Sequence, residues 1–121
     1  MVPRPNRLKR RNDFAQLRRY GRKKAHPLAV LIYCRNNEAD SRFGFSASRR
    51  VGNAIKRNRG KRLLREAVRL SLPEIDSGWD CLFIVREKTP TAAFVDVQAA
   101  VLQLLERAKL IDATNNAPNV P

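Results

Sequence analysis

Arginine and lysine side chains that could bind phosphate are concentrated between residues 49 and 69. A planar guanidinium donates two parallel hydrogen bonds to phosphate oxygens, so a surface rich in arginine suits a polyanionic ligand. At 100° per residue, a helix over residues 53–70 carries two opposite stripes. The basic stripe holds Asn58, Lys61, Arg62, Arg65 and Arg69, and the apolar stripe holds Gly60, Leu63, Leu64, Ala67 and Val68. The pattern predicts an amphipathic helix with one face for the core and one for an anionic ligand.

The whole chain shares this excess of positive charge. Its 121 residues carry a net charge of +14, and residues 1–69 hold 21 basic and 4 acidic groups against 4 and 7 in residues 70–121. Such a surface calls for a polyanionic partner, and nucleic acid fits better than a membrane surface because no helix pairs a basic face with exposed aromatic residues. No apolar run is long enough to span a membrane, and the N-terminus lacks the apolar stretch of a secretory signal, so we expect a cytoplasmic protein without a membrane partner.

The charges on the basic stripe are almost all of one sign. Lys61 and Arg65 lie one helical turn apart and repel each other, and Glu66, four residues after Arg62, offsets only part of this repulsion. A merely solvated face more often mixes the two signs, so phosphate binding is the favoured interpretation. The predicted nucleic-acid-binding residues are Arg49, Arg50, Asn53, Lys56, Arg57, Asn58, Arg59, Lys61, Arg62, Arg65 and Arg69.

Other chemistry has little support in the sequence. His26 is far in sequence from Ser46 and Ser48, and nothing orients it as a general base, so we expect no catalytic residues in the protein itself. Cys34 and Cys81 lie in separate apolar runs without a CxxC spacing, which predicts buried, reduced thiols and no metal site. A helix-turn-helix is also excluded, because a strand follows the basic helix.

The elements that must position the basic helix form a single α+β domain. Residues 1–11 are predicted to be a flexible basic arm, residues 22–26 a connector, and residues 112–121 a frayed tail. A short first helix starts at Asn12 as its cap and ends at Gly21. Strands are predicted at 28–34, 42–48 and 80–86, the first two as an antiparallel hairpin, and a last helix begins at 89–91. The order is therefore α-β-β-α-β-α, with helices packed on a small sheet.

Several segments together resemble the bacterial ribonuclease P protein family. The basic helix reads Arg57-Asn58-Arg59-Gly60-Lys61-Arg62-Leu63-Leu64-Arg65-Glu66, and residues 44–54 before it read Gly-Phe-Ser-Ala-Ser-Arg-Arg-Val-Gly-Asn-Ala. The N-terminal pattern of Asn6-Arg7-Leu8-Lys9, then Asp13-Phe14, then Gly21 is similar as well. The resemblance covers roughly residues 6–110, and the combined string over 44–66 is its most specific part.

This resemblance implies a four-stranded sheet and a left-handed βαβ crossover that contains the basic helix, giving the order α-β-β-(β)-α-β-α. The sequence leaves the place of the fourth strand open, and splitting or extending residues 27–48 is one way to obtain it. It also implies the function of a ribonuclease P subunit. Mg²⁺ would be bound mainly by the catalytic RNA and the substrate. The catalytic RNA would carry out removal of the 5′ leader of precursor tRNA, and the protein alone would be inactive. A ribosomal or ribonucleoprotein-assembly protein that binds RNA without promoting cleavage is the alternative.

The resemblance further implies a cleft for the single-stranded leader, between the first helix and the sheet. The predicted cleft residues are Phe14, Leu17, Arg18, Ile32, Tyr33, Ser46 and Ser48. Arg18 stands where the family often has a second aromatic residue, and Ile32 stands where it often has a tyrosine. Tyr33, one residue later, is equally compatible with the core, since neighbouring strand residues point to opposite faces. Trp79 is interpreted as a loop anchor rather than an RNA contact, and Gly60 is expected to allow close packing on the sheet.

Overall fold

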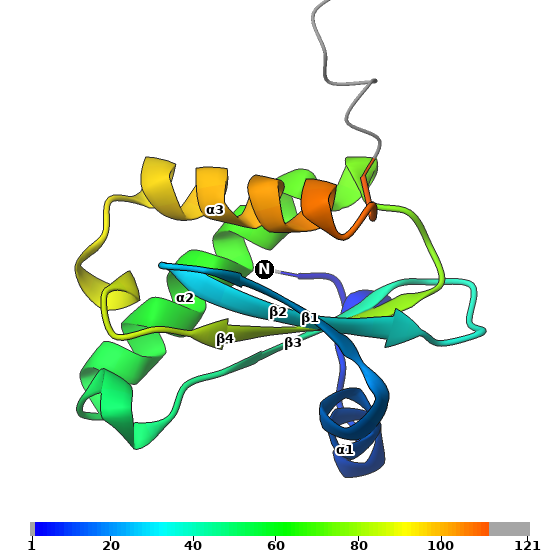
Figure 1. The fold of residues 1–121 in the computed structure, drawn as a ribbon, viewed down its shortest axis with the longest axis horizontal. Coiled ribbons are helices and arrows are strands. Elements are labelled where there is room, and N and C mark those ends of the chain that lie inside the picture. Colours follow the sequence, from blue (N-terminus) through cyan, green and yellow to red (C-terminus); the bar gives the residue numbers. More distant parts are fainter. Residues whose placement is uncertain (1, 112–121) are drawn as a thin grey trace, which may run out of the picture.

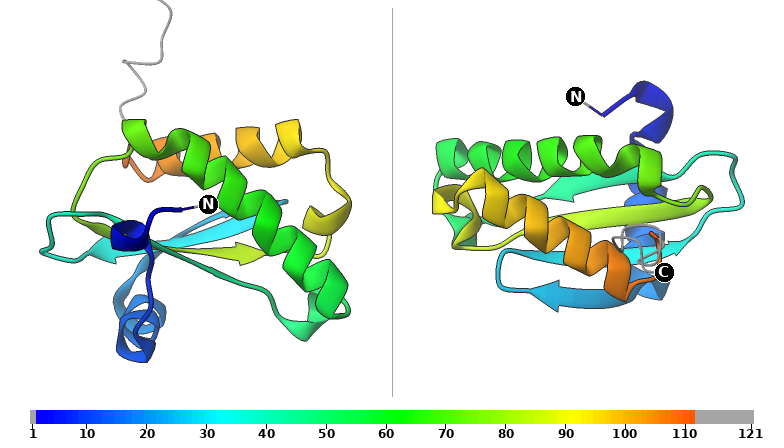
Figure 2. Two further views of the ribbon diagram at one scale, coloured as in Figure 1. Left: turned by 180° about the vertical axis from the view of Figure 1, so that it is seen from behind. Right: turned by 90° about the horizontal axis from the view of Figure 1, so that it is seen from above.

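A four-stranded sheet forms the middle layer of the computed structural model, which describes residues 2–111 (Figure 1). Helix α1 packs on one face of the sheet, and helices α2 and α3 cover the other (Figures 1 and 2). The elements are α1 (Arg11–Tyr20), β1 (Arg22–His26), β2 (Ala29–Arg35), β3 (Arg42–Ser46), α2 (Ala54–Ser71), β4 (Trp79–Val85) and α3 (Phe94–Arg107). Short 3₁₀ turns are η1 (Arg4–Asn6), η2 (Arg49–Val51), η3 (Leu72–Glu74) and η4 (Thr89–Thr91). The α+β class is confirmed, and the order is α-β-β-β-α-β-α.

The strand order is β1-β2-β4-β3, which corrects two predictions. The predicted hairpin of residues 28–34 with 42–48 is wrong, because β4 lies between β2 and β3, antiparallel to the first and parallel to the second. Strand β4 carries apolar side chains on both faces and therefore takes a central place. The hairpin of the fold is β1–β2.

The fourth strand is β1, not a part of residues 27–48. The segment Arg22–His26 was predicted to be a connector because it lacks an apolar alternation. As an edge strand it pairs only with β2, and charged side chains are common on such edges. Strands β3 and β4 are parallel neighbours joined through α2, which gives the expected βαβ crossover.

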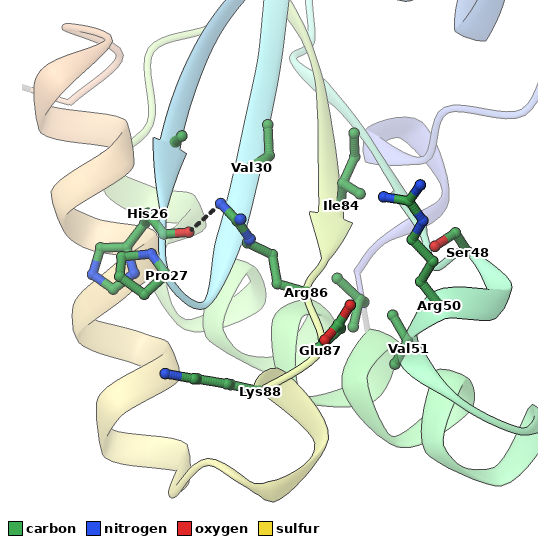
Figure 3. Close-up of a pocket in the computed structure, with 12 residues that line it drawn as sticks. His26, Pro27, Val30, Ser48, Arg50, Val51, Ile84, Arg86, Glu87 and Lys88 are labelled. Atoms are coloured by element: carbon green, nitrogen blue, oxygen red, sulfur yellow. Dashed lines mark hydrogen bonds between the residues drawn. The ribbon is translucent and has the colours of Figure 1, made fainter.

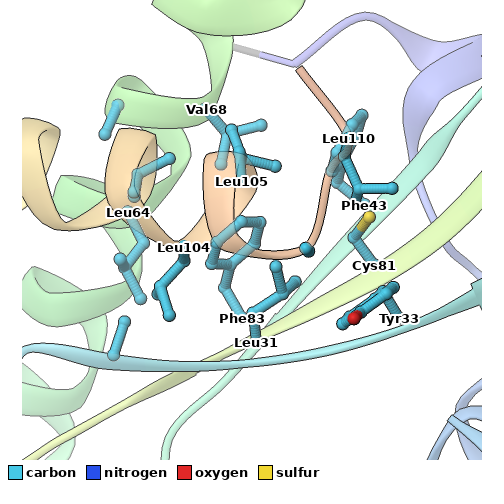
Figure 4. Close-up of a cluster of buried hydrophobic side chains, with 14 of the residues drawn as sticks. Leu31, Tyr33, Phe43, Leu64, Val68, Cys81, Phe83, Leu104, Leu105 and Leu110 are labelled. Carbon is cyan, nitrogen blue, oxygen red and sulfur yellow. The ribbon is translucent and has the colours of Figure 1, made fainter. Parts of the chain in front are cut away.

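Two apolar clusters hold the layers together. The larger one lies between the sheet and the α2–α3 pair, with Phe83 fully buried at its centre among Leu31, Leu64, Leu104 and Leu105 (Figure 4). The smaller one joins α1 to the other face of the sheet and consists of Leu8, Leu17, Ile32 and Leu82. Helix α1 contacts the sheet through this small cluster, so it covers only the part of its sheet face that lies around Ile32 and Leu82.

The predicted flexible arm is docked on the sheet instead. Val2 and Leu8 are 3% and 6% exposed, and the Leu8 amide donates a hydrogen bond of 2.9 Å to the carbonyl oxygen of Phe43. The Asn6 side-chain amide donates to the carbonyl oxygen of Ser41 at 2.7 Å. Proline and arginine content suggested disorder, but two apolar side chains and the open edge of β3 anchor the segment. The predicted frayed tail, residues 112–121, lies outside the described residues.

Helix starts follow local hydrogen bonding. Asn53 caps α2, and its side-chain oxygen accepts from the Lys56 amide at 3.0 Å. Asn12 does not cap α1, which already begins at Arg11. Helix α3 begins at Phe94 rather than at 89–91, because the Thr89 hydroxyl ties η4 to the sheet by donating to the carbonyl oxygen of Leu28 at 2.6 Å.

Candidate nucleic-acid interface

The basic face of α2 is open to solvent, as the helical spacing predicts. Asn58, Arg62 and Arg65 are exposed, and Lys61 and Arg69 are partly exposed. On the opposite stripe, Gly60, Leu64, Ala67 and Val68 are buried and Leu63 is partly buried. The helix therefore presents its cations outward while its apolar stripe packs on the sheet and α3.

Few of these cations have an acidic partner. Glu66 pairs with Arg69 rather than Arg62, and the hydrogen bonds from Arg69 lower the pKa of the Glu66 carboxyl. Within residues 2–111, Arg42 and Arg69 are the basic side chains that form ion pairs. The remaining arginines and lysines of α2 are thus available to an external anion.

Arg57 occupies a different place from the exposed stripe. Its side chain is half-buried, and its Nε atom is buried without a hydrogen-bond partner among the described residues. Arg57, Lys61 and Arg65 follow one another at four-residue spacing, so they form a row along one flank of α2. The Arg65 guanidinium lies 5.8 Å from the centre of the Phe45 ring, which places the end of this row beside β3.

Further basic residues surround the start of α2. Arg49 and Arg50 are exposed in η2, and Lys56 and Arg59 are exposed in the first turns of the helix. Gly52 joins the two elements with a φ of 137°, a backbone conformation that other residues rarely adopt. The predicted RNA-binding residues therefore lie on one connected segment, 49–69, with Asn53 also serving as the helix cap.

Helix α1 covers only the half of its sheet face around Gly44, Leu82 and Ile32, which pair in register. The Phe14 ring lies directly on Gly44, where an added Cβ would be 2.6 Å from Phe14 Cε1. Leu17 is fully buried against the sheet, so it supports the cleft and does not contact a ligand. Arg18 is exposed, and Ile32 is 7% exposed beneath the helix.

Tyr33 belongs to the core and not to the cleft. It lies on the α2–α3 face of the sheet with 4% of its surface exposed, and its ring centre is 6.0 Å from that of Trp79. Trp79 packs there under the Arg35 guanidinium, 4.8 Å away, in agreement with its interpretation as an anchor. The tyrosine is thus removed from the predicted cleft residues, because the pleat of β2 turns it to the opposite face from Ile32.

A pocket of about 720 Å³ lies over the half of the sheet that α1 leaves uncovered (Figure 3). Its floor includes Val30 and Ile84, which pair in register beside Ser46, and Ser48 is at its rim. The cations Arg50, Arg86 and Lys88 surround this apolar floor together with His26 and one acid, Glu87. Arg86 is held in place by donating to the carbonyl oxygen of His26 at 3.3 Å (Figure 3).

Sequence reasoning missed most residues of this pocket. Val30 could have been found, since it lies two residues before Ile32 and shares its face. Arg86, Glu87 and Lys88 follow the end of β4, and only the three-dimensional strand order brings them next to the β1–β2 turn. An apolar floor with a cationic rim suits a single-stranded nucleic acid, whose bases pack on the floor while its phosphates meet the rim.

Residues 2–111 contain no group of three or more histidine, cysteine or acidic side chains placed to hold a metal ion. Cys34 and Cys81 are both free, the first half-buried and the second fully buried, and burial raises the pKa of each thiol. No helix in the described part of the chain has the length and apolar character of a membrane span.

Comparison with known proteins agrees with this geometry. The family model described as Ribonuclease P matches residues 2–109. The chain is 42% identical over 109 residues to the ribonuclease P protein component of Herpetosiphon aurantiacus, covering 90% of this chain and 89% of that protein. The corresponding protein of Dehalococcoides mccartyi is 37% identical over 110 residues, with 91% and 90% covered.

Solved structures show the same fold. The ribonuclease P protein of Staphylococcus aureus superimposes with a TM-score of 0.79 at 28% identity, covering 88% of this chain and 98% of that one. The protein of Thermotoga maritima gives a TM-score of 0.75 at 31% identity, covering 84% and 96%. On the combined evidence of its basic helix, its fold and these relatives, the chain belongs to the ribonuclease P protein family.

Proposed function

We propose that this protein component of ribonuclease P binds the catalytic RNA through the basic face of α2 and the single-stranded 5′ leader of precursor tRNA through the cleft beside α1. It thereby promotes removal of the leader in tRNA 5′ maturation. Neutralising phosphates where two polyanions meet lowers their repulsion, which favours the bound precursor over mature tRNA. For this role in tRNA 5′ maturation we propose a cytoplasmic location.

The observation that carries the proposal is the continuity of the two basic regions. Arg50 lines the large pocket and lies in η2, immediately before α2. An RNA bound along α2 and a strand lying in the pocket would therefore approach each other at η2, where Arg49 and Arg50 can neutralise both.

In the proposed function, Mg²⁺ is bound by RNA rather than by the protein. Most charged residues of the interface are cations, which repel a metal ion, and Glu87 is the one carboxylate that lines the large pocket. Phosphate oxygens of the catalytic RNA and the substrate would hold the metal ion that assists hydrolysis. The protein's own side chains orient the leader and lower the charge density around that site, so cleavage is expected at a lower Mg²⁺ concentration.

Reconstitution tests the proposal. The protein is mixed with a bacterial ribonuclease P RNA at low Mg²⁺, and cleavage of a tRNA with a 5′ extension is measured. We expect the protein to restore cleavage that the RNA alone performs poorly under these conditions. Binding of the RNA without any gain in cleavage would favour the alternative, a ribosomal or assembly protein.

The leader cleft has its own test. Arg86→Gln with Lys88→Gln removes two rim charges and should weaken binding of precursor tRNA while leaving mature tRNA almost unchanged. The matched control is Arg35→Gln with Lys109→Gln, which removes the same charge from residues that do not line the pocket. Equal losses for precursor and mature tRNA would argue against a leader site here. Phe14→Ala should likewise affect only the precursor, because an aromatic ring on α1 can stack on a leader base.

A further inference from the structure

A second, smaller pocket lies at the outer edge of β3. Its volume is about 340 Å³, and it is lined by Val2, Arg7, Leu8, Phe14, Phe43, Gly44, Phe45 and Arg65. No residue is shared with the lining of the large pocket. The N-terminal segment, β3 and α2 meet on this side of the molecule (Figure 2, left). The pocket is therefore a separate site, enclosed by the segment that docks on the sheet.

The lining combines aromatic rings with two guanidinium groups. Phe45 is half-buried, its ring is stacked on that of Phe83 with 6.0 Å between the ring centres, and the Arg65 guanidinium lies 5.8 Å from the Phe45 ring centre. Arg7 also lines the pocket, and its Nε donates to the carbonyl oxygen of Val2 at 2.7 Å. Phe14 packs on Gly44 and closes the pocket on the α1 side of the sheet. Aromatic rings and arginines in one concave site are the groups that stack on unpaired bases and bind the adjoining phosphates.

The size of the pocket limits what it can hold. Small-molecule sites in proteins span roughly 300–1,000 Å³, so this pocket lies at the lower end. It suits one planar group rather than a stretch of helix or several stacked bases. A single base that has left its own helix is such a group.

The flank of α2 leads into this pocket. Arg57, Lys61 and Arg65 are spaced four residues apart, so successive side chains rise by about 6 Å along the helix. The last of the three is the arginine at the pocket wall. A polynucleotide backbone that follows this row would arrive at the pocket with its phosphates already bound.

We propose that this pocket receives one unpaired base of the catalytic RNA, packed against the Phe45 ring beside Arg65, with its flanking phosphates on Arg7 and on the Arg57–Lys61 row. This inference rests on the proposed function, because it assigns the ligand of α2. The catalytic RNA is favoured over the leader because three cations of the α2 row lead to the site and the large pocket shares none of its lining. The site adds recognition of one flipped nucleotide to the electrostatic binding of phosphates.

Chemical probing of base reactivity tests the inference in the assembled enzyme. The catalytic RNA is probed free and bound to the wild-type protein, in the presence of precursor tRNA. We expect one unpaired base to be protected by the wild type and to regain its reactivity with Phe45→Leu, which removes the ring but keeps an apolar side chain. Loss of one base–aromatic stack should also weaken binding of the catalytic RNA by roughly tenfold or more.

Matched controls separate this effect from loss of folding or charge. Phe94→Leu removes a partly buried ring on α3 and should cost similar stability without changing any protection. Arg65→Lys keeps the charge but loses the planar group, and it should also release the base. Arg35→Lys makes the same change at the arginine that lies on Trp79, and the protection should persist.

Each outcome has a defined reading. If Phe45→Leu and Arg65→Lys leave every protected base unchanged, the pocket is not a base site. If the base released by these variants belongs to the leader, the assignment to the catalytic RNA is overturned. If the wild-type protein neither binds the catalytic RNA nor promotes cleavage, the proposed function itself fails. If it does both but protects no base through this pocket, only the inference about the pocket fails.

Discussion

Gly60 lies in the middle of α2, where glycine costs about 1 kcal/mol of helix propensity relative to alanine. The structure gives the reason for its presence, since an added Cβ would be 2.5 Å from Cγ1 of Val85. Val85 is buried and β-branched, so its short, stiff side chain cannot rotate away from the added methyl group. The close approach predicted for this glycine is thus confirmed, and it brings α2 onto β4.

Gly60→Ala should therefore destabilise the protein, although alanine favours a helix. Overpacking costs about 1–3 kcal/mol and outweighs the gain in propensity, so we expect a net loss of roughly 1 kcal/mol in thermal unfolding. Adding Val85→Ala should make the two changes less than additive, because the smaller side chain accepts the new methyl group. A stabilised Gly60→Ala variant would show that the helix does not rest on Val85.

The two cysteines give a prediction of pH dependence. Burial raises the pKa of Cys81 well above 9.0, and burial also raises that of the half-buried Cys34, with Asp80 adding to the shift. Only the thiolate reacts with iodoacetamide, so a raised pKa leaves a smaller fraction of the cysteine in its reactive form at pH 8. We expect Cys34 to be labelled slowly at pH 8 and at a higher rate as the pH rises. Cys81 should be labelled only in denaturant, and mass spectrometry measures both rates. Equal rates for both thiols in the native protein would contradict the burial of Cys81.

Individual site residues could be predicted from the sequence where one helix determined their position. The cations of α2 lie on the face that the 100° rotation gives, because all of them belong to one rigid element. Leu17 and Tyr33 were predicted as cleft residues but are buried, since the facing of a helix or strand depends on what packs against it. Arg86 and Lys88 escaped prediction for the same reason, because strand order brings them to the pocket.

Among the elements, α1 is attached to the sheet by few contacts. One of them is Arg42, which donates to Asp80 at 2.9 and 2.8 Å and also lies 3.5 Å from Asp13 of α1. The hydrogen bonds with Asp80 raise the pKa of Arg42, so the guanidinium stays charged. This half-buried cluster holds the first turn of α1 over the sheet and so fixes one wall of the cleft.

Asp13→Asn should loosen α1 selectively. It removes the charge that faces Arg42 while the Arg42–Asp80 pair remains, and we expect a modest loss of about 1 kcal/mol or less. Amide hydrogen exchange should speed up in α1 but not in α3. Asp96→Asn is the matched control, since it also removes an acidic residue from the first turn of a helix. Equal acceleration in α1 and α3 would indicate a global effect rather than a local attachment.

The sequence predicted the elements whose periodicity is strong, namely α2, α3 and the apolar strands β2 and β4. It did not predict β1, because an edge strand of charged residues has no apolar alternation and is defined only by its pairing with β2. It also placed β2 beside β3, because a short connection favours a hairpin. Instead β4 lies between β2 and β3, because its apolar side chains must be buried on both faces of the sheet. This central position can be recognised only by comparing β4 with all the other strands.

At the scale of the molecule, basic side chains gather on α2, on η2 and around both pockets. The basic residues of α2 and η2, the rim of the large pocket and Arg7 are brought into reach of one extended polyanion, while residues 70–121 carry more acidic than basic groups. Counterions released from RNA on binding make such an interface depend on salt. Each phosphate neutralised contributes a slope of roughly −0.7 to −0.9 to the dependence of log K on log salt concentration.

Removing three cations from α2 should therefore flatten that slope. Arg59→Gln, Arg62→Gln and Arg65→Gln together eliminate three exposed guanidinium groups, and the slope for the catalytic RNA should fall by about two. The control triple variant Arg35→Gln, Arg107→Gln and Lys109→Gln has the same net charge but changes residues outside α2 and both pockets. If net charge alone governed binding, both variants would lose the same slope. If the face of α2 binds the phosphates, only the first variant changes, and filter binding or fluorescence titration at several salt concentrations distinguishes the two outcomes.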